Sequence, residues 1–391
     1  MIKPNDKLKY IPFSPIRKIF NRVNVLKSQG EEIISLGIGE PDFDTPTHIS
    51  EAMFNATRNG ATHYTPNKGI LELRKAISKN LLKDSNLVYD PEEIICTVGV
   101  SEGLYIALTA FLNPEDEVLV PDPAWLNYGH ITTLSGAKTV YYSLTAGNGF
   151  QIDSTELENL ITDKTKAVII LDPSNPTGSI LTEESLRNVA KLAKEHDLLV
   201  ISDEIYEKII YDGNKHYSIA TLPDMRERTI ILNGFAKAYA MTGWRLGYLA
   251  APENLIQPMA KIHSYLVTSA SSMVQYGGVA AIEGTQKPLE DMVEEFRIRR
   301  DYVYNEINSI KGLSCVKPGG AFYMFVDVRG TGLVGEEFAE YLLNKAGVAV
   351  VPGTAFGKRA TYEVRISYAT SMDNLKKAMN NIRNACEKLL I

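Results

Sequence analysis

The sequence predicts an α/β protein in which a mostly parallel sheet carries helices on both faces and a smaller α+β domain is attached. Four continuous, β-branched apolar runs predict strands that are buried on both faces, as in a parallel sheet. A helical pattern lies between two of these runs, and a long helical pattern follows near residue 288. The four runs are 117–123, 167–173, 198–204 and 229–235.

The segment 182–197 predicts the helix of a strand–helix–strand unit. Thr182 is a suitable N-cap, and two glutamates follow it in the first turn. Leu186 and Val189 continue at helical spacing. In sheets built from such units, ligands bind beyond the C-terminal ends of the strands. The residues that directly follow the four runs are therefore the first candidates for a site.

The second domain is predicted from the change of pattern after residue 287. Apolar residues from Leu289 to Ile310 fit one face of a long helix, and another helix is expected from about residue 335. Strands are expected at 347–353 and 362–369, and a helix at the C-terminus. The expected domains are 46–287 for the large one, and 1–45 with 288–391 for the small one.

Composition excludes several classes of function. The 391 residues carry a net charge of −6, and no long Lys/Arg run is present, so neither nucleic acid nor an anionic membrane is expected as a partner. No long uncharged apolar stretch predicts a membrane span, and the charged N-terminal stretch does not resemble a signal peptide. The three cysteines are far apart and the six histidines lack metal-ligand spacing. We therefore expect a cytoplasmic protein without a metal site.

Lys237 lies just beyond the predicted strand 229–235, among small and apolar residues. A solvent-exposed lysine after a strand is the simpler interpretation. The alternative follows from desolvation, which lowers the pKa of an amine and makes it a nucleophile toward carbonyls. The second interpretation predicts a Schiff base between Lys237 and an aldehyde.

Other polar residues also follow predicted strands, and each has a structural alternative. Arg245 either rests its stem on Trp244 or offers a planar donor to a phosphate or carboxylate. Asn175 lies in a turn-rich loop, from which it can donate to a ligand oxygen. Asp203 is either a helix N-cap or a buried carboxylate that needs a cationic partner. Tyr206 follows three residues later and can equally be a core tyrosine.

Three further residues have similar double interpretations. The turn before Val100 and Ser101 predicts a helix start whose N–H groups can bind an anion. Trp125 can stack on a flat ring or fill the core. Arg365 alternates with apolar neighbours in its strand, which is more typical of an edge or salt-bridged residue than of a ligand clamp.

Taken together, these groups are what pyridoxal phosphate requires. The amine holds the aldehyde, and a buried aspartate keeps the pyridine nitrogen protonated so that the ring accepts electrons. An amide and a phenol bind the phenolate oxygen, and the indole covers the ring. One arginine binds the phosphate, and a second binds the carboxylate of a substrate.

The stretch 234–247, GFAKAYAMTGWRLG, closely resembles the lysine motif of class I/II aminotransferases, the aspartate aminotransferase family of fold type I. The other motifs of that family are similar in order and spacing, so the resemblance covers nearly the whole chain. They are GEPDFDTP at 39–46, HYTPNKG at 63–69, NPTG at 175–178, SDEIY at 202–206 and VRISYA at 364–369.

The resemblance implies catalytic roles for Lys237, Asp203 and Tyr206. Lys237 would be the Schiff-base lysine and the base that moves the proton between substrate Cα and the cofactor. Asp203 would pair with the pyridinium nitrogen, while Asn175 and Tyr206 would contact the phenolate oxygen. Trp125 would stack on the ring.

The resemblance also implies how the two anionic groups are bound. Val100, Ser101 and Arg245 would hold the phosphate, and Tyr64 would reach it from the other subunit of a homodimer. Arg365 would bind the substrate α-carboxylate when the small domain closes on the substrate. The implied substrate contacts are Gly39, Trp125, Asn175 and Arg365.

The implied activity is that of an amino-acid aminotransferase with a ping-pong mechanism and 2-oxoglutarate as the expected acceptor. Aspartate is favoured as donor, with aromatic amino acids as the alternative and β-elimination on the same cofactor as a third reaction. A binding protein that kept the fold without catalysis is a different class, and the presence of Lys237 counts against it.

Two positions depart from the pattern of many relatives. Ala236 stands where many have a serine that donates to the phosphate, so one hydrogen bond worth about 1 kcal/mol is missing. Ser101 stands where some aspartate-specific relatives have a lysine for the distal carboxylate. Arg17 and Lys18 are candidates for that contact, although solvated helix residues are the simpler interpretation.

Overall fold

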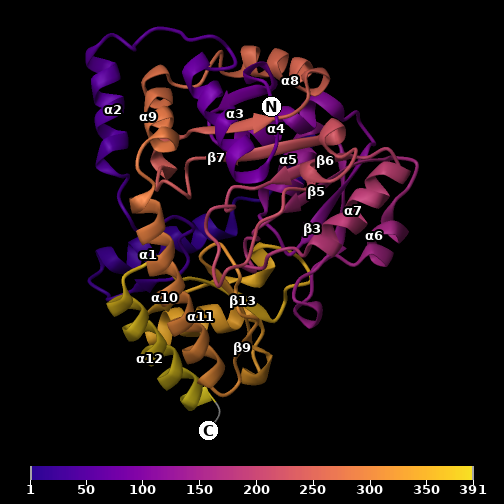
Figure 1. Ribbon diagram of the computed structural model, residues 1–391. Helices are drawn as coiled ribbons and strands as arrows, with labels where there is room; N and C mark the ends of the chain where they lie inside the picture. Colours follow the sequence, from indigo (N-terminus) through magenta and orange to yellow (C-terminus); the bar gives the residue numbers. More distant parts are fainter. Residues whose placement is uncertain (1, 390–391) are drawn as a thin grey trace.

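The computed structural model describes residues 2–389. Its large sheet has seven strands, and Figure 1 shows it in the upper part of the molecule. Six strands point the same way, and β8 runs antiparallel to both of its neighbours. The predicted mostly parallel sheet is therefore confirmed. Its strands in spatial order are β2 (Ile94–Thr97), β8 (Gly247–Ala250), β7 (Thr229–Gly234), β6 (Leu199–Asp203), β5 (Thr165–Leu171), β3 (Glu117–Asp122) and β4 (Lys138–Ser143).

Helices cover both faces of this sheet, as the continuous apolar strands require. Successive residues of a strand point to opposite faces, and in β6 Val200 joins the core around α7 whereas Ile201 joins the core around α4. The first face carries α4 (Val100–Phe111), α5 (Asn127–Ser135) and α8 (Glu253–Leu266). The second carries α3 (Leu71–Ser85), α6 (Ser154–Leu160), α7 (Glu183–Glu195) and α9 (Ser272–Glu283), with α2 (Thr47–Arg58) against α9.

The expected N-cap of α7 is confirmed, because the Thr182 side chain accepts a hydrogen bond from the Ser185 backbone N–H. The helix buries one apolar stripe on the sheet, so its sequence pattern and its packing agree.

A second region holds an antiparallel sheet and the long helix α10 (Lys287–Ser309). The chain between residues 15 and 35 joins it, because β1 (Ile34–Ser35) pairs in parallel with β11 (Val348–Ala349) and Val23 of α1 packs near Leu343. Figure 1 shows α1 in the same lower part of the molecule as the C-terminal helices. The other elements are α1 (Pro15–Ser28), β9 (Ser314–Cys315), β10 (Tyr323–Asp327), α11 (Gly335–Ala346), β12 (Val351–Pro352), β13 (Glu363–Ser367) and α12 (Met372–Leu389).

The single strand expected at 347–353 is wrong in one respect. The segment forms two short strands in different sheets, since β11 pairs with β1 whereas β12 pairs with β13. Every residue from Val348 to Val351 is buried. The apolar run is therefore unbroken, and the sequence gives no sign of the change of partner.

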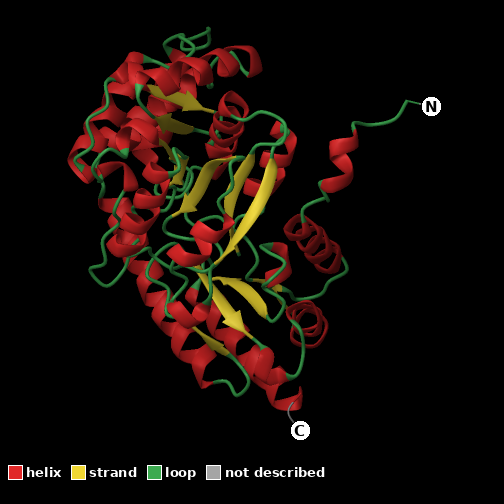
Figure 2. Ribbon diagram, turned by 90° about the vertical axis from the view of Figure 1, so that its right-hand side faces the viewer, coloured by secondary structure: helices red, strands yellow, loops and turns green. Residues whose placement is uncertain are grey.

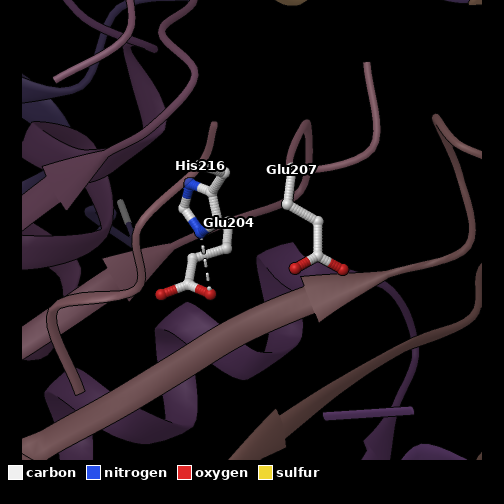
Figure 3. A group of neighbouring side chains, drawn as sticks. All are labelled: Glu204, Glu207 and His216. Atoms are coloured by element: carbon white, nitrogen blue, oxygen red, sulfur yellow. Dashed lines mark ion pairs between the residues drawn. The ribbon is translucent and has the colours of Figure 1, made fainter. Parts of the chain in front are cut away.

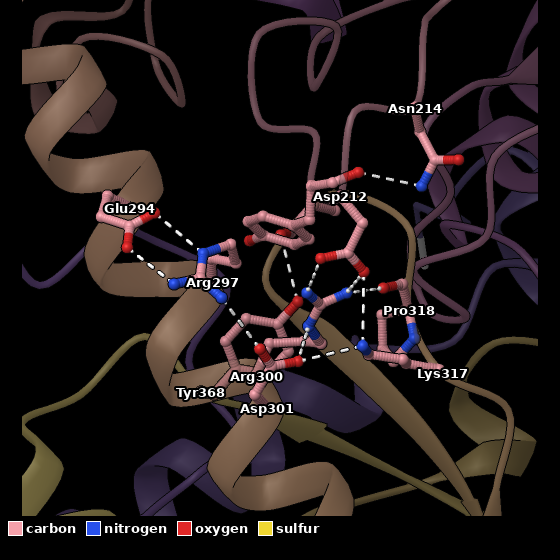
Figure 4. Close-up of polar contacts among 11 residues, drawn as sticks. Asp212, Asn214, Glu294, Arg297, Arg300, Asp301, Lys317, Pro318 and Tyr368 are labelled. Atoms are coloured by element: carbon pink, nitrogen blue, oxygen red, sulfur yellow. Dashed lines mark hydrogen bonds and ion pairs between the residues drawn. The ribbon is translucent and has the colours of Figure 1, made fainter.

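A buried arginine ties α10 to the loop after β6 (Figure 4). Arg300 is fully buried, and its two terminal nitrogens donate to the Asp212 carboxylate at 2.9 and 2.8 Å. The same guanidinium donates to the Pro318 carbonyl at 2.8 Å, just before β10. The contact thus joins α10, the loop that follows β6 and the segment that precedes β10.

Within residues 2–389, no helix has the length and hydropathy needed to cross a membrane.

Candidate functional site

A pocket of about 410 Å³ opens where β5, β6 and β7 end. Ten of the eleven predicted site residues line it, although they are spread over more than 300 positions of the chain. The parallel strands explain this convergence, because their carboxyl ends share one edge of the sheet. The ten are Gly39, Val100, Ser101, Trp125, Asn175, Asp203, Tyr206, Lys237, Arg245 and Arg365.

Tyr64 is the eleventh, and it does not line the pocket of its own chain. It lies between α2 and α3 with 90% of its surface exposed. The expectation that it serves a second subunit therefore remains a prediction.

Lys237 carries an amine that is poised to lose its proton. Its Nζ donates to the Gly39 carbonyl at 2.6 Å. Burial lowers the pKa of Lys237 to about 8, and the positive charges of Arg365 and Arg245 add to this, against the opposite effect of Glu40. The interpretation of Lys237 as an ordinary surface lysine is wrong, and a useful fraction of the amine is neutral near physiological pH.

Asp203 is the last residue of β6 and is almost completely buried. Its Oδ2 accepts from the Tyr128 hydroxyl at 2.6 Å, and its Oδ1 accepts from the Ile205 N–H at 3.2 Å. Burial raises the pKa of Asp203 to about 6. No helix starts here, so the N-cap alternative is wrong. A cationic ring N–H beside this carboxylate would stabilise its charged form.

Arg365 lies on β13, an interior strand of the small sheet, with 2% of its surface exposed. Its terminal nitrogens donate to Asn175 Oδ1 at 2.9 Å and to the Gly37 carbonyl at 2.7 Å. The guanidinium lies 4.5 Å from the centre of the Tyr323 ring. Within residues 2–389, Arg365 has no acidic partner and its Nε has no hydrogen bond. The edge or salt-bridged alternative is therefore wrong, and the arginine offers a buried donor for a carboxylate.

A helix start and an arginine converge at the opposite end of the pocket. Helix α4 begins at Val100, directly after Gly99, whose φ is +74°. A Cβ on Gly99 would come within 2.6 Å of a terminal nitrogen of Arg245, so glycine permits this close approach. Arg245 is exposed, and one of its nitrogens donates to the Thr242 carbonyl at 2.9 Å. The first N–H groups of a helix and a neighbouring guanidinium together favour an anion.

Sequence reasoning missed two tyrosines of the pocket. Tyr128 holds Asp203, and the Tyr323 hydroxyl lies 2.9 Å from that of Tyr206. Tyr128 comes three residues after Trp125, a helical spacing that could have indicated a shared site. Tyr323 becomes visible only through the register of β10 and β13, which places it opposite Ser367, two residues beyond Arg365.

Neither Arg17 nor Lys18 lines this pocket, and both are exposed. Ile16 takes the position on the wall instead. The expected cationic contact for a distal carboxylate is therefore not made within this chain, because α1 turns its apolar face toward the site.

Three other titratable side chains gather behind the strand ends (Figure 3), where no metal site was expected. They are Glu204, Glu207 and His216. His216 Nδ1 lies 2.9 Å from Asp172 Oδ2, and its Nε2 lies 3.2 Å from Glu204 Oε2. Burial alone would lower the pKa of His216, but the two carboxylates outweigh it and hold that pKa well above its usual range. His216 therefore forms ion pairs with Asp172 and Glu204, and Glu207 lies beside them.

The residues present fit pyridoxal phosphate. The pocket brings together an amine with a lowered pKa, a buried carboxylate beyond the middle of the sheet and a cradle over Gly99 for a phosphate. The buried and incompletely hydrogen-bonded Arg365 adds a place for a substrate carboxylate. Each feature is chemically complementary to one charged or reactive group of the cofactor or its substrate.

Comparisons with known proteins agree with this arrangement. A family described as aminotransferase class I and II matches residues 31–382. An aspartate aminotransferase of Pyrococcus abyssi is 47% identical over 97% of both chains. An aromatic-amino-acid aminotransferase of Thermococcus litoralis is 44% identical over 99% of both chains. The crystal structure of an aspartate aminotransferase from Rhizobium meliloti superposes with a TM-score of 0.95 at 38% identity, covering 99% of each chain.

Proposed function

The chain belongs to the class I and II aminotransferases, which are pyridoxal-phosphate enzymes, and we propose that it moves the α-amino group of aspartate to 2-oxoglutarate. The observation that carries this proposal is the buried amine of Lys237, with its pKa lowered to about 8, in one pocket with Asp203, Arg245 and Arg365. The amine can react with the aldehyde of the cofactor, and the carboxylate can pair with its ring nitrogen. The two guanidinium groups can bind the phosphate of the cofactor and the carboxylate of an amino acid.

Pyridoxal phosphate, when bound, supplies an aldehyde for amines and a protonated ring that draws electrons from the substrate Cα. Lys237 would take the proton from the substrate Cα through its Nζ and return it. Asp203, whose Oδ2 accepts a hydrogen bond from the Tyr128 hydroxyl, would hold the proton on the ring nitrogen. Because Asp203 is buried and Lys237 is partly buried, their charges act in a medium that screens them less than water does.

The remaining pocket residues position the cofactor. Val100, Ser101 and Arg245 would hold its phosphate at the start of α4. Asn175 and Tyr206 would bind its phenolate oxygen. Trp125, which meets the Tyr128 ring edge-on at 5.4 Å, would cover one face of the ring.

Arg365 would bind the α-carboxylate common to all amino donors, beside the Gly39 backbone, so it does not select the side chain. The aspartate aminotransferases among the relatives support aspartate as donor. An aromatic donor is the alternative, supported by the Thermococcus litoralis relative and by the apolar wall that Ile16 and Ile38 form. β-Elimination is a third reaction that the same lysine could start.

We further propose a homodimer in which Tyr64 contributes to the partner's phosphate site. Large apolar side chains are exposed along the N-terminal segment, which Figure 2 shows leading away from the body of the molecule. Tyr10 is 74% exposed and Phe13 is 100% exposed, and such surfaces are typical of contacts between proteins. A monomer by light scattering would contradict the dimer. The cysteines are free, which supports a cytoplasmic location.

The proposed domains are 46–287 and, together, 1–45 with 288–391. The contact of Arg365 with Asn175 joins the two across the pocket. We expect a substrate analogue to make the enzyme more compact in small-angle scattering, and Arg365→Ala to lose this response.

Steady-state kinetics of the purified enzyme with 2-oxoglutarate test the function. Aspartate should give the highest kcat/KM, ahead of phenylalanine and tyrosine; the reverse order would make the enzyme an aromatic aminotransferase. Release of ammonia without 2-oxoglutarate would instead indicate elimination.

Replacing Lys237 tests the mechanism. Lys237→Ala should lower kcat by about 10⁴-fold or more, because the variant loses both the amine and the base. If this variant still turned over amino acids at a similar rate, the role of Lys237 would be wrong.

A further inference from the structure

A buried histidine lies behind the start of α4, outside the pocket. His263 belongs to α8 and is fully buried, and its Nδ1 is 2.6 Å from Glu102 Oε1. Glu102 is the third residue of α4, and its other oxygen, Oε2, accepts from the Val98 N–H at 2.5 Å. This carboxylate therefore lies in the same turn of chain as the proposed phosphate contacts Val100 and Ser101.

A carboxylate in this place needs an explanation. Negative side chains in the first turn of a helix favour the helix itself, because they complement its dipole. Here, however, the helix start is also meant to bind a phosphate, and a second negative charge nearby weakens that binding. The side chain of Glu102 is 7% exposed, so water screens its charge weakly.

The hydrogen bonds of His263 show how this charge is removed. Its Nε2 lies 2.9 Å from the Asn67 carbonyl, which can only accept, so Nε2 carries a proton. Its Nδ1 faces a carboxylate oxygen at 2.6 Å, and two bare acceptors do not approach so closely. A second proton therefore lies between Nδ1 and Oε1. Whichever atom holds it, the pair of Glu102 and His263 is neutral as a whole.

The same imidazole also contacts the loop of Tyr64, the residue proposed to serve the phosphate site of the partner subunit. Asn67 belongs to the loop that carries Tyr64, and its side-chain Nδ2 donates to the Thr268 carbonyl at 2.6 Å, just beyond α8. The contacts thus run from Val98 through Glu102 and His263 to Asn67. They hold the start of α4 and the Tyr64 loop in a fixed relation.

We propose that His263 is a positioning residue of the phosphate site: it cancels the charge of Glu102 and fixes the start of α4 against the Tyr64 loop. The inference rests on the proposed function, because it assumes that the phosphate of the cofactor binds at this helix start. It goes further by assigning a role to two residues that do not line the pocket.

The test compares two ligands that differ only in the phosphate. Apoenzyme of His263→Gln is titrated with pyridoxal phosphate and with pyridoxal, and the affinities are read from cofactor absorbance and tryptophan quenching. We expect the affinity for pyridoxal phosphate to fall about tenfold or more, while the affinity for pyridoxal changes less than about twofold. His196→Gln, at the exposed end of α7, is the control and should bind both ligands as the wild type does.

Glu102→Gln removes the negative charge and, combined with His263→Gln, should reverse the effect of that variant on phosphate affinity. In Glu102→Gln the amide oxygen can still accept from Val98, and no charge remains to be cancelled. The affinity of Glu102→Gln for pyridoxal phosphate should therefore equal or exceed that of the wild type. The double variant should recover most of the loss seen in His263→Gln. If His263→Gln does not fold, Glu102→Gln alone decides, and a loss of phosphate affinity beyond about fivefold would overturn the proposal.

Two other results would also overturn it. One is an equal loss for both ligands in His263→Gln without recovery in the double variant, which is the behaviour of a purely structural histidine. The other is unchanged binding of pyridoxal phosphate in His263→Gln. A wild-type apoenzyme that does not prefer pyridoxal phosphate to pyridoxal would instead remove the phosphate site itself, and the proposed function would fail with it.

Discussion

The two arginines of the pocket, which are proposed to bind two different anionic groups, have opposite surroundings. Arg365 is buried on an interior strand, and Asn175 and the Gly37 carbonyl hold its guanidinium. Arg245 is exposed, in a left-handed conformation with φ of +54°, and donates only to Thr242 within the described residues. One cation is fixed and dehydrated before any ligand arrives, whereas the other remains hydrated.

The difference in burial matches two proposed tasks: Arg365 positions the substrate, whereas Arg245 helps to retain the cofactor. Keeping a guanidinium buried without a carboxylate is costly, so the fold maintains Arg365 for a ligand that must be placed accurately at every turnover. Arg245 could remain hydrated in its proposed role, because the cofactor would stay bound through many turnovers and the N–H groups of α4 would share the phosphate with it. The two ends should therefore respond differently when their arginines are replaced.

Arg365→Ala should give the largest effect at either end. We expect kcat/KM for the amino donor to fall about 100-fold to 1,000-fold, because a substrate carboxylate would lose its charged partner in a buried site. The affinity for pyridoxal phosphate should change less than about twofold, since the proposed phosphate site lies at the other end of the pocket. Steady-state kinetics and a cofactor titration measure the two quantities.

Arg365→Lys is the matched control for geometry. It keeps the charge but loses the planar fork that two hydrogen bonds now orient. An intermediate loss in kcat/KM would show that orientation matters as well as charge. Full activity would mean that the positive charge alone suffices for substrate binding. The fixed orientation of Arg365 would then not distinguish its role from that of Arg245.

Arg245→Gln should show the reverse pattern with a smaller magnitude. The affinity for pyridoxal phosphate should fall about 30-fold, corresponding to about 2 kcal/mol for a charged hydrogen bond. With saturating cofactor, KM for the amino donor should remain as in the wild type. A raised KM under those conditions would mean that the two ends are not independent.

The sequence predicted the site residues whose neighbours are unusual for their type. It did not predict the residues that hold those site residues in place. Lys237 among apolar neighbours and Asp203 at a strand end indicated their surroundings directly, because burying a charge requires a reason. Tyr128 and Tyr323 are common as core residues, and only packing and strand register bring them to the site. The split of 347–353 into two strands escaped prediction for the same reason, since pairing between distant segments leaves no local mark.

The lowered pKa of Lys237, which lies in the same pocket as both arginines, affects the stability of the cofactor-free enzyme. Its pKa falls from an ordinary 10.5 to about 8, mainly through burial. Between these two values the unfolded chain binds more protons than the folded one, so the free energy of unfolding rises with pH across this window. Below pH 8 the charged amine destabilises the fold in full, by about 1–2 kcal/mol after allowance for partial exposure.

Lys237→Met removes this charge at similar length, so the apoenzyme should gain that stability. The difference between variant and wild type should be largest at pH 7 and should shrink toward pH 10, because other groups titrate alike in both. Urea unfolding at three pH values measures it. A difference that stays constant with pH would show that the amine is not desolvated.

Ala236→Ser should give the smallest effect and acts at the phosphate end alone. Ala236 lines the pocket beside Lys237, where a hydroxyl would add one donor for the phosphate. One such hydrogen bond is worth about 1 kcal/mol, so the cofactor should dissociate about fivefold more slowly, with kcat/KM for the amino donor unchanged. Ala236→Gly, which adds no donor, is the control and should not slow dissociation. If Ala236→Ser instead changed kcat/KM for the amino donor, the hydroxyl would also act on the bound substrate. The proposed phosphate site and the proposed substrate-carboxylate site would then not be independent.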